Sequence, residues 1–145
     1  MAAPWADVLY AMDRNWWARY VAQVEAECEG LRVSPLSGMK GVSKILFKHY
    51  QNSGCGAVSL AAHWNAKRII LLGYDCQKTC GKAHWHGDHP KGLGNAGSIA
   101  TWPGQFKKLA ADLTGLEIIN CSRETALTMF ERRPLAEVLN ERSPA

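Results

Sequence analysis

Apolar and polar residues alternate along this chain in blocks that predict a regular succession of strands and helices. The segment 68–73 is apolar almost without interruption, which is typical of a strand buried on both faces of a parallel sheet. Within 15–28, by contrast, Trp16, Tyr20 and Val24 recur at helical spacing. The whole pattern predicts strands over 6–11, 31–34, 44–48, 68–73 and 116–120 and helices over 15–28, 53–64, 102–113 and 135–139.

Strands that alternate with helices favour an α/β domain with a mostly parallel sheet. We expect a single domain over 1–145, with a three-layer Rossmann-like architecture of about five strands and a disordered tail at 141–145. In such sheets, ligands bind outside the carboxyl ends of the strands. The polar residues at or near predicted strand ends are therefore candidates for ligand binding: Asp13, Tyr74, Asp75, Ser122 and Arg123.

The turn Asn52-Ser53-Gly54 opens the second predicted helix. Ser53 is a good N-cap residue, and we expect the helix to begin after it. The amide groups at a helix N-terminus, together with the helix dipole, suit an anion or a phosphate. We therefore expect Asn52, Ser53 and Gly54 to bind the phosphate of a ligand.

Composition and charge narrow the classes of function. Hydrophobic residues make up 47% of the chain, enough for a folded core. No run approaches the roughly 18 apolar residues that cross a bilayer, and the first residues do not resemble a signal peptide. We therefore expect a cytoplasmic protein with reduced cysteines and no membrane partner. The net charge of +4 is compatible with a nucleotide and also with nucleic acid.

A histidine cluster is the strongest candidate for chemistry. His84, His86, Asp88 and His89 fall within six residues, in a long glycine-rich loop predicted over 76–98. Loops of this length in a compact domain are usually functional or disordered, and histidine is the side chain that titrates near neutral pH. We take these four residues as the candidate catalytic group.

The cluster fits more than one chemistry. The cluster has the motif His-x-His-x-Asp-His, which is the signature of metallo-β-lactamases and would make the protein a zinc-dependent hydrolase. That fold, however, is longer and needs histidines after residue 89, where this chain has none. A local zinc site is the second interpretation, with ligands drawn from Cys76, Cys80, His84, His86, Asp88 and His89.

The interpretation that we favour needs no metal. One histidine then acts as general acid or base or pairs with a phosphate, and Lys82 neutralises phosphate charge. Asp75 is expected to contact the ribose, the base or a magnesium ion. A loop without chemistry is the remaining alternative.

Several segments together resemble phage and prophage proteins of unknown function: 6–10, 13–17, 52–54, 71–75, 84–90 and 118–122. This group is distantly similar to the Rossmann-like superfamily of the archaeal 6-hydroxymethylpterin pyrophosphokinase-like domains and the bacterial family 42 sialyltransferases. The resemblance implies a nucleotide or nucleotide-sugar ligand and transfer of a glycosyl or pyrophosphoryl group, with a histidine rather than a metal at the reacting centre. A non-catalytic role, in sequestering a nucleotide or in virion assembly, is the alternative.

The chain departs from these relatives in one respect. They begin with a strand and a Gly-x-Gly-Pro-Ser-Leu turn that contacts the nucleotide phosphate, and the 145 residues do not contain this turn. A sheet without that strand has an exposed inner edge, which favours pairing with another chain. We therefore expect a homodimer or higher oligomer, located in the host cytoplasm or in the virion.

Overall fold

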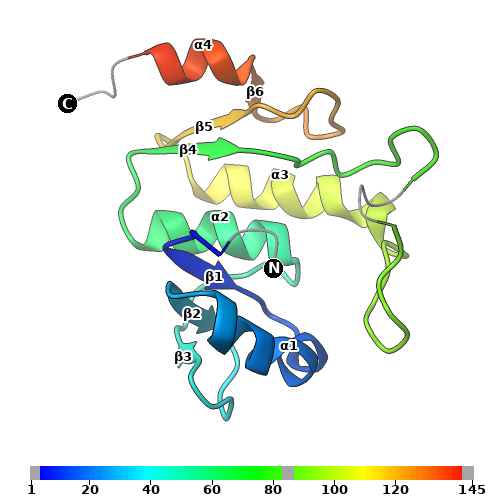
Figure 1. Ribbon diagram of the computed structural model, residues 1–145. Helices are drawn as coiled ribbons and strands as arrows, with labels where there is room; N and C mark the ends of the chain where they lie inside the picture. The colour runs from blue at the N-terminus through cyan, green and yellow to red at the C-terminus, as the bar shows by residue number, and fades with distance from the viewer. Residues whose placement is uncertain (1–3, 83–86, 142–145) are drawn as a thin grey trace.

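The computed structural model describes residues 4–82 and 87–141, which form two small parallel sheets flanked by helices (Figure 1). Its elements are β1 (Val8–Tyr10), α1 (Arg14–Glu27), β2 (Leu31–Ser34), β3 (Ser43–Lys44), α2 (Ser53–His63), β4 (Arg68–Leu71), η1 (Ile99–Thr101), α3 (Trp102–Asp112), β5 (Glu117–Asn120), β6 (Glu131–Arg132) and α4 (Leu135–Asn140). The predicted α/β class is confirmed, and so is the parallel direction of the strands.

The strands are divided between two sheets, in the orders β1-β2-β3 and β4-β5-β6. Val8 pairs with Leu31 in the first sheet, and Ile70 pairs with Ile119 in the second. The structure thus differs from the expected single sheet of about five strands. Within the described ranges, β1 and β4 are not paired, although each is the first strand of its sheet.

Two strands have lengths that the sequence pattern did not predict. The strand expected over 44–48 is reduced to Ser43–Lys44, because the chain then turns away through Tyr50 and Gln51, both with φ of 55°. β6 has only two residues, both exposed, and was not predicted.

Polar caps fix where the first two helices begin. The Asp13 carboxylate accepts hydrogen bonds from the N–H groups of Asn15 and Trp16, at 2.8 and 3.2 Å, and so caps α1. The N-cap of α2 is Asn52, whose Oδ1 accepts from the N–H of Cys55 at 3.0 Å. The prediction of Ser53 as N-cap is therefore wrong by one residue. Asn52 takes the role because its amide Nδ2 is also bound to Gln105, at 2.9 Å.

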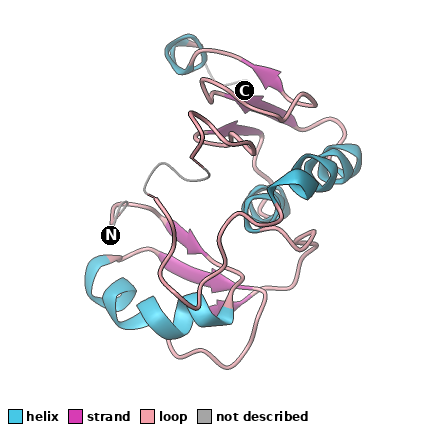
Figure 2. Ribbon diagram, turned by 90° about the vertical axis from the view of Figure 1, so that its right-hand side faces the viewer, coloured by secondary structure: helices cyan, strands magenta, loops and turns pink. Residues whose placement is uncertain are grey.

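Helices lie on both sides of the sheets. Figures 1 and 2 show α1 on one side of the β1–β3 sheet and α2 on the other, with α3 beside α2. α2 therefore contacts both halves of the molecule. Its Gly56 lies against the Tyr10 ring of β1, and its Val58 packs with Leu71 of β4.

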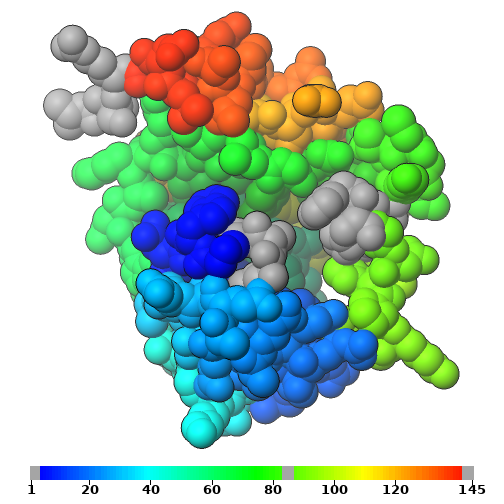
Figure 3. Space-filling model, in the orientation of Figure 1, coloured from blue at the N-terminus to red at the C-terminus, as the bar shows by residue number. Residues whose placement is uncertain are grey.

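The buried side chains form two separate hydrophobic cores. The larger joins α2 and α3 to the β4–β6 sheet and includes Val58, Leu71 and Phe106. The smaller lies under α1 and is built on Trp17 and Val24. In the space-filling view, the first sheet with α1 forms the lower part of the visible face, in blue to cyan, and the later segments form the upper part and the right-hand side (Figure 3). Each half therefore has its own apolar core.

The C-terminal segment is fixed by ion pairs. Glu141 pairs with Arg133, and also with Arg68 of β4 at 3.3 Å. Of the tail expected to be disordered over 141–145, Glu141 is thus ordered, and 142–145 lie outside the described residues. Within the described part of the chain, no helix has the length and apolar character needed to cross a membrane.

Candidate functional site

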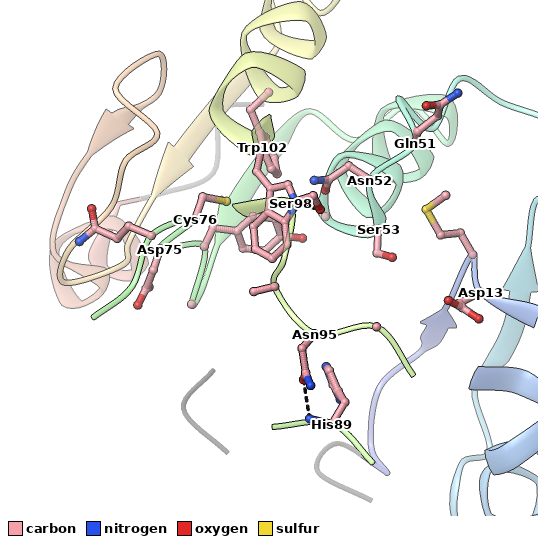
Figure 4. A pocket seen from close by; sticks show the side chains of 18 of the residues that line it. Asp13, Gln51, Asn52, Ser53, Asp75, Cys76, His89, Asn95, Ser98 and Trp102 are labelled. Carbon is pink, nitrogen blue, oxygen red and sulfur yellow. Dashed lines mark hydrogen bonds between the residues drawn. The ribbon is translucent and has the colours of Figure 1, made fainter. Parts of the chain in front are cut away.

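A cavity of about 940 Å³ lies beside the carboxyl ends of β1 and β4. Met12 and Asp13 follow β1, and Gly73 to Gln77 follow β4. The N-terminus of α2, the loop after β4 and the start of α3 complete the walls. Figure 4 shows Asp75 and Cys76 on one side and Asp13 on the opposite side. The cavity thus draws its walls from both halves of the molecule.

The N-terminus of α2 forms part of the cavity wall. Asn52, Ser53 and Gly54, the residues predicted to bind a phosphate, all line it. Asn52 is held by its two hydrogen bonds, so its side chain serves the helix and the cavity wall rather than presenting a free amide. A Cβ on Gly54 would lie 3.1 Å from both Tyr74 and Phe106, so only glycine fits here without displacing an aromatic ring.

The end of β4 is clamped by the end of β5. The Tyr74 N–H donates to Ser122 Oγ at 2.7 Å, and the Tyr74 carbonyl accepts from Thr125 Oγ1 at 2.7 Å and from Asn120 Nδ2 at 3.3 Å. Asn120 is fully buried, and its Oδ1 also accepts from the Ser122 N–H at 2.9 Å. This network fixes the direction in which Tyr74 and Asp75 leave the sheet.

Charged groups of both signs line the cavity. The acidic ones are Asp13, already engaged as a helix cap, and Asp75, whose Oδ2 accepts from Thr79 Oγ1 at 3.1 Å. Lys82 and His89 contribute from the long loop. The His89 N–H donates to Asn95 Oδ1 at 2.7 Å, so the loop crosses back on itself at this point (Figure 4).

Several predicted site residues lie elsewhere. Ser122 is buried behind Tyr74, and Arg123 is exposed, so neither lines the cavity. Both follow β5, whose carboxyl end supports the cavity wall from behind. Asp88 and Cys80 are exposed and also lie outside the lining. The predicted catalytic residues His84 and His86 lie outside the described residues.

The proposed zinc ligands are only partly placed. Cys76 lines the cavity, and burial, with a smaller contribution from Asp75, raises the pKa of its thiol to about 11. Across 4–82 and 87–141, no group of three or more side chains is arranged to hold a metal ion. His84 and His86 lie outside these ranges, and the zinc hypothesis stays a prediction.

Sequence reasoning missed the aromatic and amide side chains of the cavity. Trp102 and Phe106 come from the start of α3, and Asn95 and Ser98 from the loop before it. The Trp102 indole N–H donates to Ser98 Oγ at 3.0 Å, which fixes the ring at the cavity wall. The available signal was the position of Trp102 between a long loop and an amphipathic helix, which we interpreted only as a helix start.

The partly buried Tyr74 predicts a loss of stability at alkaline pH. Burial raises its pKa to about 12, from an ordinary value of about 10. The folded state therefore keeps the proton at pH values where the unfolded chain releases it, so this contribution to stability is complete below pH 10 and is lost as the pH rises toward 12. Denaturant titrations give the free energy of unfolding at pH 8 and at pH 11. Its decrease between the two pH values should be about 1 kcal/mol smaller in Tyr74→Phe than in the wild type. An equal loss in Tyr74→Phe and in the wild type would contradict the prediction.

Comparisons with known protein families, with curated proteins and with solved structures find no match to this chain.

Proposed function

We propose that the cavity binds a nucleotide or a nucleotide-sugar. The observation that carries the proposal is the position of the cavity beside the carboxyl ends of β1 and β4, which are the first strands of two parallel sheets whose strand orders run outward from this point on opposite sides. If the two sheets are taken as halves of one, the order is β3-β2-β1-β4-β5-β6, a Rossmann-like arrangement. A point at which the strand order reverses is the usual ligand site of such folds.

The lining supports a ligand with an anionic part and a planar part. The α2 N-terminus and Lys82 suit a phosphate, because backbone N–H groups and a cation both stabilise negative charge. Trp102 and Phe106 offer apolar ring surface for a base. Asp75 lines the same cavity, and in this proposal its carboxylate accepts hydrogen bonds from the ribose.

The reaction that we propose is glycosyl or pyrophosphoryl transfer. Among the described residues of the candidate catalytic group, His89 lines the cavity. Its imidazole would accept a proton from the acceptor group or donate one to the leaving phosphate. His89→Gln should then abolish turnover while the ligand still binds. Loss of binding and turnover together would instead make His89 a ligand-binding residue.

The binding test uses thermal shift and calorimetry with CMP, UDP-sugars, ATP and cyclic nucleotides. At least one of these ligands should raise the melting temperature of the wild type, since a ligand that binds only the native state stabilises it. If none binds, the proposed function is wrong.

Lys82 provides a sharper prediction for the ligand that binds. A hydrogen bond to a charged group is worth about 1.5–3 kcal/mol, so Lys82→Gln should weaken binding at least about tenfold. The matched control is Lys78→Gln, which removes an exposed lysine of the same loop that does not line the cavity. Equal affinities of the two variants in calorimetry would place the phosphate elsewhere.

A further inference from the structure

The long loop after β4 is closed at the cavity by a side-chain hydrogen bond. The N–H of His89 donates to Oδ1 of Asn95 at 2.7 Å, and both residues line the cavity (Figure 4). Between them, the N–H of Leu93 donates to the carbonyl of Pro90 at 3.1 Å, which forms a turn. Asn95 therefore holds the backbone of the residue to which we assign proton transfer.

Asn95 is itself joined to the start of α3. Its carbonyl accepts from the N–H of Gly97 at 2.6 Å. The next residue, Ala96, is buried, and its carbonyl accepts from the N–H of Ile99 at 3.2 Å. Ile99 begins η1, which leads directly into α3. The position of Asn95 is thus fixed from the helix side, and His89 takes its place relative to it.

The hydrogen bond to His89 also determines how the carboxamide of Asn95 is oriented. A backbone N–H can only donate, so the atom of Asn95 that it contacts is the oxygen, and the nitrogen Nδ2 takes the other position. Nδ2 can donate but cannot accept. Across residues 4–82 and 87–141 it has no hydrogen-bond partner, and Asn95 is exposed. Asn95 therefore offers the cavity hydrogen-bond donors in a fixed orientation.

The surroundings of these donors favour a phosphate. Lys82 lines the cavity from the same loop, and paired backbone hydrogen bonds of 3.0 Å with Thr79 hold its main chain. Among the described residues that line the cavity from 77 to 98, none carries a carboxylate. This part of the wall thus offers donors and positive charge. Hydrogen bonds from such groups to an ionised oxygen are roughly twice as strong as those between neutral groups.

We propose that Asn95 is a phosphate-binding residue, whose Nδ2 donates to an oxygen of the phosphate of the nucleotide. The proposal rests on the proposed function, since it requires that a nucleotide occupies the cavity. Because Oδ1 of the same side chain holds the backbone of His89, the bound phosphate lies beside the histidine that acts on it.

Two substitutions separate the donor of this carboxamide from its acceptor. Asn95→Asp keeps an oxygen for the N–H of His89 but replaces Nδ2 by a second oxygen and adds a negative charge. Asn95→Ala removes both groups. A side chain that only closes the loop can be replaced by aspartate better than by alanine. A side chain that donates to a phosphate tolerates aspartate least.

The first measurement is calorimetry with whichever nucleotide of the panel above binds the wild type most tightly. Asn95→Ala should weaken binding at least about tenfold, because a hydrogen bond to a charged group is lost. Asn95→Asp should weaken it further, because its carboxylate repels the phosphate. The matched control is Asn65→Asp, which adds the same charge beyond the opposite end of α2, outside the cavity lining. This control should bind as the wild type does.

The order of the two Asn95 variants decides the proposal. If Asn95→Asp binds the nucleotide as tightly as Asn95→Ala does, or more tightly, residue 95 serves only to close the loop and the proposal is overturned. Since Asn95 is exposed, we expect both variants to keep the melting temperature of the wild type.

The corresponding nucleoside is the second probe, titrated by nuclear magnetic resonance into the millimolar range. It has no phosphate, so Asn95→Asp should bind it with the affinity of the wild type. Equal losses for nucleoside and nucleotide would place Asn95 against the base or the ribose and would overturn the proposal.

These results distinguish the two proposals. If the wild type binds no nucleotide of the panel, the proposed function is wrong, and the role of Asn95 is overturned with it. If the wild type and Asn95→Asp bind the nucleotide equally, the proposed function stands and only the role of Asn95 is wrong.

Discussion

Replacing Gly30 by alanine is expected to lower the free energy of unfolding by about 3 kcal/mol. A Cβ at this position would lie 2.1 Å from the carbonyl oxygen of Ala6 and 2.7 Å from that of Asp7. Both are backbone atoms just before β1, so they cannot move aside as the end of a flexible side chain would. The substitution should separate β1 from β2 and break the hydrogen bond from the Leu31 N–H to the Asp7 carbonyl.

Because the two halves have separate cores, this damage should remain local. Hydrogen exchange of the Gly30→Ala variant should show faster exchange in β1, α1 and β2, and nearly unchanged protection in β4 and β5. The matched control is Gly104→Ala. Gly104 lies inside α3 with nothing near its Cβ position, so the variant should gain up to about 1 kcal/mol. Uniform loss of protection in Gly30→Ala would show that the halves unfold as one unit.

Replacing Asn120 by alanine is expected to cost about 3 kcal/mol as well, by a different mechanism. Its side chain satisfies the carbonyl of Tyr74, the hydroxyl of Thr125 and the N–H of Ser122. Removing it leaves buried polar groups with fewer partners, and each unsatisfied group costs about 1–3 kcal/mol. Denaturant unfolding measures this loss.

The Asn120 variant should also weaken ligand binding, since the same network directs Tyr74 and Asp75 into the cavity. Val138→Ala provides the control for stability alone, because it removes a buried side chain of α4 that does not line the cavity. This variant should be destabilised and yet bind as the wild type does. If Asn120→Ala binds with wild-type affinity after correction for the unfolded fraction, the network supports only the fold.

Local patterns in the sequence predicted most of the elements, because their signals are contained within short segments. The apolar run that became β4, and the spacing of Trp16, Tyr20 and Val24 in α1, are signals of this kind. The N-cap of α2 was misplaced because asparagine and serine are both good caps and stand side by side. Only the contact between Asn52 and Gln105, 53 residues away, distinguishes them.

The division into two sheets could not be predicted, because it depends on which strands are adjacent in space. Alternation of strands and helices predicts parallel pairing but not a missing contact between β1 and β4. Asp75 and Ser53, which were chosen at a strand end and a helix N-terminus, line the cavity, and their binding roles stay predictions. Ser122 and Arg123 do not line it, since a residue after a strand can support a wall as well as form one.

The separate cores have a consequence for the evolution of this chain. The connection at 45–52 joins two halves whose hydrophobic cores share no buried residue. A recombination event in that connection would exchange the first sheet and α1 while leaving the second core intact. Homologous chains should therefore vary in their first 44 residues independently of the remainder, apart from positions that contact α2, such as Tyr10.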